Sequence, residues 1–503
     1  MTLVCLALLL AALGIQSCKK SKSDIAKALY DETKNKVFKD LQTDSFSVIL
    51  KKTLEAKSNT LNNPKLITAF YEQHEYEPVL VLKHLPQGRL KEALPYFSNA
   101  KAHGLDPELF KASALGTLIN KFYDKKGIAD KNQAYKELAN LEVMVANALL
   151  NYSNALQFGV ISPKRIYARY YTETQRPDSA SMQRVFAQND IKSFLDSIQP
   201  KDPQYLALQK ALASGVKAPK MSAEETQRVL AVNLERLRWK NKPKEDKYVL
   251  VNIADYRLDV MDKGKSIMNM KVVVGEGRNK TFTDNLAEYD EHDLKKDRPF
   301  SRETPQLYSM IHSVQVNPVW NIPQSIATNE ITKSAAADPY YLSNNNIDVY
   351  KDGKRIEDTE TIDWSAPDAG KAYAFKQRPG EDNALGKIKF LFKNQSSVYL
   401  HDTPAKAAFS RSERALSHGC VRVEKPLDLA KALFGEGKKF DLIKKNMESD
   451  DPQATDIALP NKVPVYLTYF TAWQDDTGAL QFRKDVYGLD IVLYTHLQRL
   501  GRK

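Results

Sequence analysis

The hydrophobic pattern of this chain changes its period near residue 240, and this change limits the folds that the chain can adopt. Before it, apolar residues recur every three or four positions, and between Leu138 and Leu156 they mark one face of an amphipathic helix. After about residue 245, the stretch KYVLVNIADYRLDVM indicates paired strands with a turn near Ala254 and Asp255. We therefore expect an α+β protein in which a helical region precedes a mainly β region.

The helical region extends to about residue 240 and carries clear helix starts. Ser162 followed by Pro163 is typical of a cap and first helical position, and Ser222 to Glu225 reads as a capping box. The region contains no metal-ligand spacing and no phosphate loop. A helical bundle without chemistry of its own explains it better than a partner-binding module does, although the second interpretation stays open.

The β region contains one long polar segment and one helix pattern. Residues 324–375 include SNNN and DWSAPDAG, so we expect a lid or other excursion rather than part of the core. Loops of this length are usually functional or disordered. The helix pattern covers residues 426–434, and a charged insertion covers residues 281–303.

The chain carries a formal net charge of +12, which favours an anionic partner such as an acidic polymer or a membrane surface. The positive charge is spread along the sequence, and no basic run alternates with aromatic residues. We therefore expect no nucleic-acid partner. A solubilising surface charge is the simpler explanation.

The N-terminus predicts export. The uncharged apolar run from Leu3 to Ile15 is too short to span a bilayer, which needs about 20 residues, but has the length of a signal-peptide core. Residues 15–18 read IQSC and resemble the lipobox of bacterial lipoproteins, in which the cysteine is lipidated. We expect residues 1–18 to be a lipoprotein signal peptide and Cys18 to carry the lipid, which makes the protein periplasmic and membrane-anchored.

Cys420 is then left without a cysteine partner. The chain has three cysteines; cleavage would remove Cys5, and lipid would occupy Cys18. A leftover cysteine in an exported protein indicates a reactive thiol or an intermolecular disulfide. Free cysteine is also common as a small buried residue. The polar neighbours Ser417, His418 and Gly419 argue against that alternative.

A thiol nucleophile needs a base beside it, because most free thiol is protonated at pH 7. His418 lies two residues from Cys420, where side chains seldom face each other, whereas His401 ends the predicted strand of VYLHDTP and can face Cys420 from a neighbouring strand. We expect His401 to be the base and its imidazolium to lower the pKa of Cys420. Gly419 permits a sharp bend, and the N–H groups of Gly419 and Cys420 offer an oxyanion hole.

The stretch from His401 to Arg422, with SHGCVR at its end, resembles the active-site signature of the L,D-transpeptidases with a YkuD-type catalytic domain. Further pieces similar to the family lie in the expected order along the chain. They are VVVGEG, NPVWNIP, RPGEDNALGKIKF, YLHDTP and VEKPLDLA. The combination resembles the large periplasmic branch of the family. This resemblance implies a helical scaffold domain at 19–240, a catalytic domain at 245–450 with its lid at 324–375, and a C-terminal extension at 451–503.

The family implies that Cys420 is the acyl-accepting nucleophile, that His401 is the base and that the main-chain carbonyl of Asp402 orients His401. The implied reaction joins peptidoglycan stem tetrapeptides, as donor and acceptor, by 3→3 cross-links through a thioester. Carbapenem β-lactams typically inhibit the family. No cofactor is implied, and the other six histidines have no recognisable metal-ligand spacing, so we expect no metal.

The same resemblance assigns the active-site loop. Its matching positions are Ser417, His418, Gly419 and Arg422. His418 is expected to shape the loop. Arg422 is expected either to hold the loop or a substrate carboxylate, or to form a salt bridge with a neighbour such as Glu424, and the sequence does not choose between these roles.

Two alternatives in function remain open at this stage. One is an L,D-carboxypeptidase or other cysteine hydrolase of cell-wall peptides, which uses water as acceptor. The other is a non-enzymatic lipoprotein that tethers the membrane to the wall.

The chain also has too few residues between scaffold and catalytic domain for a separate peptidoglycan-binding module, a departure from many members of the large branch.

Overall fold

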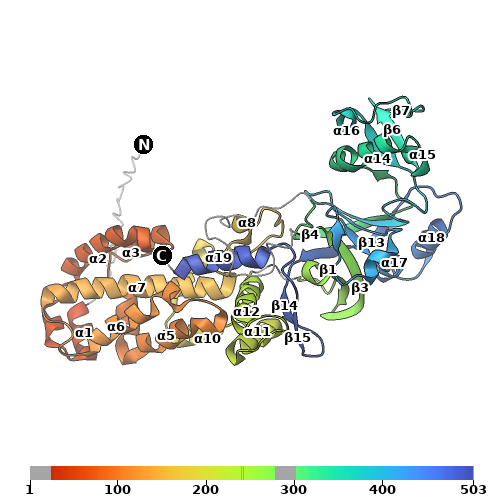
Figure 1. Cartoon of the computed structure of the whole chain (residues 1–503). Coiled ribbons are helices and arrows are strands. Elements are labelled where there is room, and N and C mark those ends of the chain that lie inside the picture. Colours follow the sequence, from red (N-terminus) through yellow and green to blue (C-terminus); the bar gives the residue numbers. More distant parts are fainter. Residues whose placement is uncertain (1–23, 240, 242, 278–301, 502–503) are drawn as a thin grey trace, which may run out of the picture. The chain divides into compact units, whose positions relative to one another are not determined.

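The computed structural model describes residues 24–239, 241, 243–277 and 302–501, whose path Figure 1 shows. The predicted signal peptide, Cys18 and most of the charged insertion lie outside the described residues. Contacts divide the chain into two compact units. The helical unit comprises Met1–Ser98, Pro107–Ser153 and Asp178–Ser197, and the barrel unit comprises Asn99–Asp106, Asn154–Pro177 and Ile198–Lys503.

The helical unit is built around Lys131–Ser153 of one long helix, α7 (Lys131–Phe158), and the whole helix contains the predicted amphipathic stretch. The expected face is buried: Leu138, Leu149 and Leu156 are each at most 3% exposed. Residues outside that face, such as Leu150, are buried as well, because shorter helices pack on several sides of α7 (Figure 1). The shorter helices of the unit are α1 (Ile25–Thr33), α2 (Thr43–Lys57), α3 (Pro64–Gln73), α4 (Val79–His84), α5 (Arg89–Ser98), α6 (Ala112–Tyr123), α9 (Ser179–Ala187) and α10 (Ile191–Ser197).

The barrel unit includes four helices from outside the mainly β region, and three of them lie in the predicted scaffold region. They are α8 (Pro163–Ile166), α11 (Pro203–Ser214), α12 (Ala223–Arg238) and α19 (Leu489–Gly501). The predicted capping box between Ser222 and Glu225 is present at the start of α12. Arg236 of α12 forms a buried ion pair with Asp490 of α19. The stretch NLERLRW is therefore a buried polar junction within the barrel unit.

The mainly β region forms a closed sheet. Its strand order is β11-β3-β12-β10-β9-β4-β13-β1-β2, and an additional pairing of β3 with β2 closes it. The strands are β1 (Lys247–Asn252), β2 (Arg257–Asp262), β3 (Lys265–Gly275), β4 (Leu307–Val316), β9 (Ile388–Phe392), β10 (Leu400–His401), β11 (Ala415–Ser417), β12 (Val421–Val423) and β13 (Thr455–Thr468). Alternate residues such as Val249 and Val251 are fully buried, as the period of two predicts. The predicted turn at Ala254 and Asp255 is a short 3₁₀ helix between β1 and β2.

Strand β13, in the predicted C-terminal extension, belongs to the closed sheet. It pairs with β4 on one side and with β1 on the other, so it lies inside the sheet. The predicted boundary at residue 450 therefore cuts the sheet, because the last strand in sequence joins strands from much earlier in the chain. Helices α17 (Pro426–Phe434) and α18 (Lys438–Met447) precede β13, and α17 matches the predicted helix.

Residues 320–377, here named the cap subdomain, contain the predicted lid. They form a four-stranded sheet of β5 (Trp320–Asn321), β8 (Ala374–Gln377), β6 (Ile347–Lys351) and β7 (Lys354–Ile356), with helices α13 (Gln324–Ile326), α14 (Thr332–Ala337), α15 (Tyr341–Asn344), α16 (Ala369–Ala372) and the π-helix η8 (Ala327–Ile331). The segment lies outside the barrel core, but it is not a structureless loop. Leu342, Val349 and Phe375, widely spaced in a polar sequence, meet in a hydrophobic cluster of its own. Its action as a lid stays a prediction.

Within the described residues, no helix combines the length and the apolar character that crossing a membrane requires.

Candidate active site

Two short parallel strands bring the predicted base and the predicted nucleophile to neighbouring positions. In the pairing of β10 with β12, Leu400 lies opposite Val421 and His401 lies opposite Arg422. Leu400 and Val421 are fully buried in the barrel core. Since side chains alternate along a strand, His401 and Arg422 point to the opposite face. Cys420 directly precedes β12, so it follows the same alternation and lies diagonally opposite His401.

The bend before Cys420 is held by a hydroxyl. Gly419 has a φ of +117°, a backbone conformation that favours glycine. The Ser417 hydroxyl donates to the Cys420 carbonyl at 2.6 Å and accepts from the Gly419 N–H at 3.2 Å. The Gly419 N–H is therefore engaged, whereas the described residues provide no hydrogen-bond acceptor for the N–H of Cys420. Of the two proposed oxyanion donors, the N–H of Cys420 is the one that is available.

Thr304 and Tyr487 anchor this loop through hydrogen bonds, and neither role could be predicted from the sequence. The Thr304 hydroxyl donates to the Gly419 carbonyl at 2.8 Å and accepts from the Gly275 N–H at 2.8 Å. The Tyr487 hydroxyl accepts from the Thr304 N–H and donates to the Gly275 carbonyl. These buried hydrogen bonds fix the carbonyl side of the bend and leave the thiol side open to the site.

His401 is held as a neutral base. Its Nδ1 donates to the main-chain carbonyl of Asp402, the contact that the family resemblance implies. Because a carbonyl only accepts, Nδ1 carries the proton, so Nε2 is the nitrogen of the neutral ring that can accept one. The main chain of Leu385 also forms a hydrogen bond with the His401 ring. Burial lowers the pKa of His401 to about 4, and the positive charge of Arg422 adds to this effect. His401 is therefore uncharged at neutral pH.

The thiol of Cys420 is also uncharged at neutral pH. Burial raises its pKa to about 11, against the opposing effects of hydrogen bonding to the Tyr399 main chain and of the positive charges on Arg422 and Lys389. The expectation that an imidazolium lowers this pKa is wrong for this state of the protein. Both groups lie in a buried site, and burial disfavours the charged form of each.

Tyr399 and Lys389 complete the polar face around the thiol. The side chains of Tyr399 and Cys420 are hydrogen-bonded, and the Tyr399 ring lies 5.9 Å from the ring of His401. The Lys389 ammonium lies 5.4 Å from the Tyr399 ring, and its pKa is lowered by burial. Lys389 lies on β9, and Tyr399 directly precedes β10. These positions next to the motif could have drawn attention to both residues, but their residue types alone do not indicate a catalytic role.

Comparison with known proteins identifies the two domains. A family model described as the L,D-transpeptidase catalytic domain matches residues 246–435, and one described as a Scaffold domain matches residues 65–212. The chain therefore contains an L,D-transpeptidase catalytic domain and a Scaffold domain. A Haemophilus influenzae protein described as a "Putative L,D-transpeptidase" is 28% identical over 491 residues, which cover 93% of this chain and 90% of that protein.

Two solved structures are also similar, at 11% identity and a TM-score of 0.20 each. One is an L,D-transpeptidase from Mycobacterium smegmatis, with 44% of this chain and 58% of that chain covered. The other is the Ldtfm-avibactam carbamoyl enzyme, with 65% and 98% covered. At this TM-score they carry no argument about the site.

Arg422 of this L,D-transpeptidase domain does not form the salt bridge that the sequence allowed. Glu424 accepts instead from the N–H of Lys271. The Nε of Arg422 is buried and has no hydrogen-bond partner among the described residues. Arg422 thus brings positive charge and an unused donor to the thiol. This arrangement favours the alternative in which Arg422 binds a substrate carboxylate.

Asp402 and His418 occupy supporting positions. The Asp402 carboxylate accepts from the Lys387 N–H at 2.9 Å and forms an ion pair with Lys406. It lies so close to Gly386 that a Cβ there would meet it at 2.5 Å, which explains the glycine of ALGKIKF. His418 is partly exposed, and its Nε2 donates to Glu330 at 2.6 Å. The catalytic role of each residue stays a prediction.

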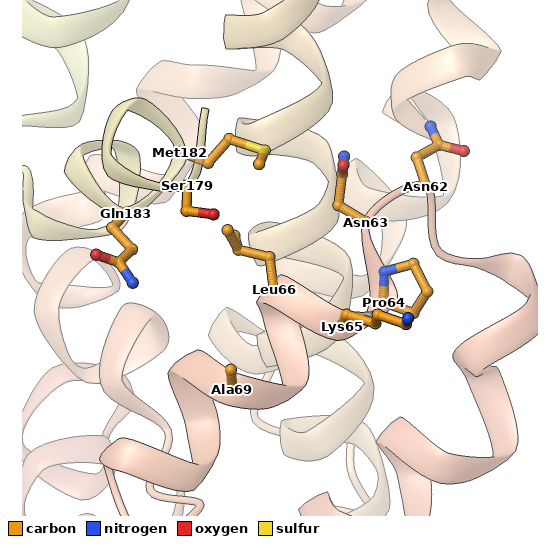
Figure 2. A pocket seen from close by; sticks show the side chains of 9 residues that line it. All are labelled: Asn62, Asn63, Pro64, Lys65, Leu66, Ala69, Ser179, Met182 and Gln183. Atoms are coloured by element: carbon orange, nitrogen blue, oxygen red, sulfur yellow. The ribbon is translucent and has the colours of Figure 1, made fainter. Parts of the chain in front are cut away.

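No cluster of three or more His, Cys, Asp or Glu side chains suited to a metal ion occurs in the part of the chain that the structure describes. A cavity of about 610 Å³ lies elsewhere, in the helical unit, between α3 and α9 (Figure 2). Neither cysteine nor histidine lines this cavity, so it offers no nucleophile and no base. Its lining residues are Asn62, Asn63, Pro64, Lys65, Leu66, Ala69, Ser179, Met182 and Gln183.

Proposed function

We propose that this protein is a peptidoglycan L,D-transpeptidase that forms 3→3 cross-links between stem peptides through a thioester on Cys420. One observation supports the proposal above all: Cys420 and the neutral His401 occupy adjacent strands, and the Cys420 N–H is unused. The family assignment supplies the reaction type. The buried, uncharged pair is suited to general-base catalysis, in which the proton moves only as the bond forms.

In the proposed first step, the donor is a stem tetrapeptide. The Cys420 sulfur attacks the carbonyl carbon of the third residue while Nε2 of His401 takes the thiol proton. The N–H of Cys420 donates to the developing oxyanion. The C–N bond to the terminal D-alanine then breaks, and His401 returns the proton to the leaving amine. The product is a thioester between Cys420 and the shortened stem.

In the second step, the side-chain amine of the third residue of another stem attacks the thioester. His401 accepts a proton from this amine, the C–S bond breaks, and the thiol regains its proton. An amide joins the two third residues. Water in place of the amine would give trimmed tripeptide stems, the reaction of an L,D-carboxypeptidase.

Positive charge beside the thiol supports a peptide donor with a free carboxylate. Arg422 and Lys389 both act electrostatically on Cys420, and the Arg422 Nε has no partner in the described protein. A guanidinium pairs well with a carboxylate, and such charge-assisted hydrogen bonds are among the strong ones. We assign the carboxylate of the terminal D-alanine to this position.

We further propose that the protein acts in the periplasm and is anchored to a membrane by lipid on Cys18. The apolar run before Cys18 and the sequence IQSC support this proposal. Mass spectrometry of the N-terminal peptide, isolated from membranes, should find Cys18 as the first residue with a lipid attached. An unmodified peptide that begins elsewhere would contradict the anchor.

The function is tested by incubating purified protein with disaccharide tetrapeptides and analysing the products by mass spectrometry. Cross-linked dimers that have lost one terminal alanine, with the bond mapped between two third residues, are the expected result. Tripeptides alone would instead establish a carboxypeptidase. No change in the substrate would overturn the enzymatic proposal and favour a tethering lipoprotein. The same incubation with Cys420→Ala is the control.

A further inference from the structure

A chain of charged contacts joins the cap subdomain to the loop that carries the nucleophile. Oε1 of Glu330 accepts from Nε2 of His418 at 2.6 Å and from Nη2 of Arg302 at 2.7 Å. The other guanidinium nitrogen, Nη1 of Arg302, contacts Glu276 at 3.2 Å. His418 lies two residues before Cys420, so one carboxylate of the cap reaches the catalytic loop itself.

These residues come from separate parts of the barrel unit. Glu330 lies in the π-helix η8 of the cap subdomain, and π-helical turns frequently occur at functional sites. Glu276 follows β3, and its N–H donates to the carbonyl of Ser417 at 2.9 Å. Arg302 leads into Thr304, which holds the Gly419 carbonyl. The cap carboxylate therefore contacts the segment before the bend directly, at His418, and is linked through Arg302 to Glu276, whose N–H holds the Ser417 carbonyl.

We propose that Glu330 is a positioning residue for the transfer reaction, and that it acts by holding His418 and thereby the shape of the nucleophile loop. The inference deepens the proposed function and rests on it for the reaction, although the contact itself does not depend on which reaction occurs. Glu330 touches neither Cys420 nor His401. Of its two partners, His418 belongs to the nucleophile loop, and the proposal assigns the effect on catalysis to this contact.

The physical argument concerns the freedom of the bend. Gly419 allows many backbone conformations, and of the hydrogen bonds described above, those of Ser417 and Thr304 restrain its carbonyl side. The bond from His418 to Glu330 restrains the segment just before it from the outside. Because the N–H of Cys420 must point at the oxyanion and the thiol at His401, small changes in this bend reduce the rate steeply. The side chains of Glu330 and His418 are 40% and 32% exposed, so a general loss of stability is not expected when the bond is removed.

The test compares Glu330→Ala, Glu330→Gln, His418→Ser and the double variant of Glu330→Ala with His418→Ser, all in the full-length protein. The first-order rate of acylation by tetrapeptide should fall about tenfold or more in Glu330→Ala, the size expected when a hydrogen bond to a charged group is lost. The donor concentration for half-maximal rate should change little. Glu330→Gln should retain part of the rate, because its amide oxygen can still accept from His418. The double variant should be no slower than the slower single variant.

Asp348→Asn is the matched control, because Asp348 is also a cap carboxylate but pairs with Arg355, at 3.0 Å, inside the subdomain. It should leave the rate within about twofold of the wild type, as expected for a pair outside the site. The proposal is overturned if Glu330→Ala keeps the wild-type rate, or if the losses of the two single variants multiply in the double variant.

Alkylation of Cys420 by iodoacetamide separates this inference from the proposed function. It reports on the loop even if the wild type transfers no stem peptide. Release of the loop should expose the partly buried thiol further and lower its pKa from about 11 towards the ordinary value. Alkylation at pH 8 should therefore be faster in Glu330→Ala and in His418→Ser, by the same factor. Unchanged alkylation in both variants would overturn the positioning role, whereas faster alkylation without stem transfer in the wild type would overturn the proposed reaction alone.

Discussion

The two units of this molecule differ in whether the polar groups around a titratable side chain have hydrogen-bond partners. In the helical unit, Glu142 is fully buried and its carboxylate is saturated: Oε1 accepts from the Tyr71 hydroxyl and the Leu80 N–H, and Oε2 accepts from the Val81 N–H, each at 2.8 Å. In the barrel unit, the N–H of Cys420 and the Nε of Arg422 have no partner among the described residues.

The difference separates a structural polar site from a functional one. A buried polar group without a partner costs stability, so a fold keeps one where a ligand or reaction uses it. An orphaned atom alone is not sufficient: the Nδ1 of His84 in the helical unit also lacks a partner. Around Cys420 the unused donors share the site with a nucleophile and a base. This combination, and not burial by itself, marks the active site.

The strongest test of this contrast removes the nucleophile. Cys420→Ala should abolish stem transfer, because no other described side chain can form the thioester, while thermal unfolding stays close to that of the wild type. Intact-mass analysis after carbapenem treatment should show one adduct on the wild type, in the peptide that contains Cys420, and none on the variant. Normal transfer by Cys420→Ala would refute the mechanism.

Removal of the base should have the next largest effect. His401→Ala should slow acylation by about 10²–10⁴-fold, the usual contribution of general-base catalysis. Because the pKa of His401 is about 4 and that of Cys420 is about 11, the wild-type acylation rate should be nearly constant over the pH range between them. It should fall on acidification through pH 4, where His401 becomes protonated. A steep rise in rate between pH 6 and 8 would indicate the imidazolium–thiolate pair that we reject.

Substitution of Arg422 tests whether its unused Nε–H binds the substrate. Arg422→Met should reduce acylation by a tetrapeptide about 10–100-fold, the range for a lost hydrogen bond to a charged group. A donor that ends in D-alaninamide lacks the carboxylate, so the variant and the wild type should differ much less with it. Equal losses with both donors would show that Arg422 supports the loop instead.

The sequence predicted those features that depend on neighbours along the chain. The change in hydrophobic period separated helices from strands, and the alternation around Ala254 located the turn between β1 and β2. The L,D-transpeptidase motif from His401 to Arg422 identified the family, which the family models confirm. The placement of His401 and Cys420 on adjacent strands followed from the strand-like pattern before His401.

The features that the sequence did not reveal depend on contacts between distant segments. The insertion of β13 between β1 and β4 joins residues about 200 positions apart, which no local pattern shows. The cap core is assembled from widely spaced apolar residues. The pKa direction of Cys420 was predicted wrongly because it follows from desolvation, which depends on the packing around the site. Thr304 and Glu330 act through hydrogen bonds to the loop, and their residue types are common on any surface.

The last prediction concerns the saturated site and should leave transfer unchanged. Burial raises the pKa of Glu142 to about 7, against the hydrogen bonds from Leu80, Val81 and Tyr71. The folded state therefore holds this proton more tightly than the unfolded state, where the pKa is about 4.5. The contribution of this bound proton to the free energy of unfolding is complete below pH 4.5 and is lost as the pH rises through 7. Each unit of difference between the folded and unfolded pKa values of Glu142 corresponds to about 1.4 kcal/mol, so the free energy of unfolding falls by roughly 3 kcal/mol.

Glu142→Gln removes this titration. Urea unfolding of the wild type and the variant, followed by circular dichroism from pH 5 to pH 8, should show the wild type losing stability relative to the variant across this range, because other titrating groups such as His84 cancel in the difference. Glu137→Gln is the matched control on the same helix, since Glu137 forms a partly exposed ion pair with Lys121 at 2.9 Å. It should change stability by about 1 kcal/mol or less, with little dependence on pH. A stability difference between the wild type and Glu142→Gln that stays constant over this range would show that the carboxylate is already ionised at pH 5, and that its saturated hydrogen bonds outweigh the cost of burial.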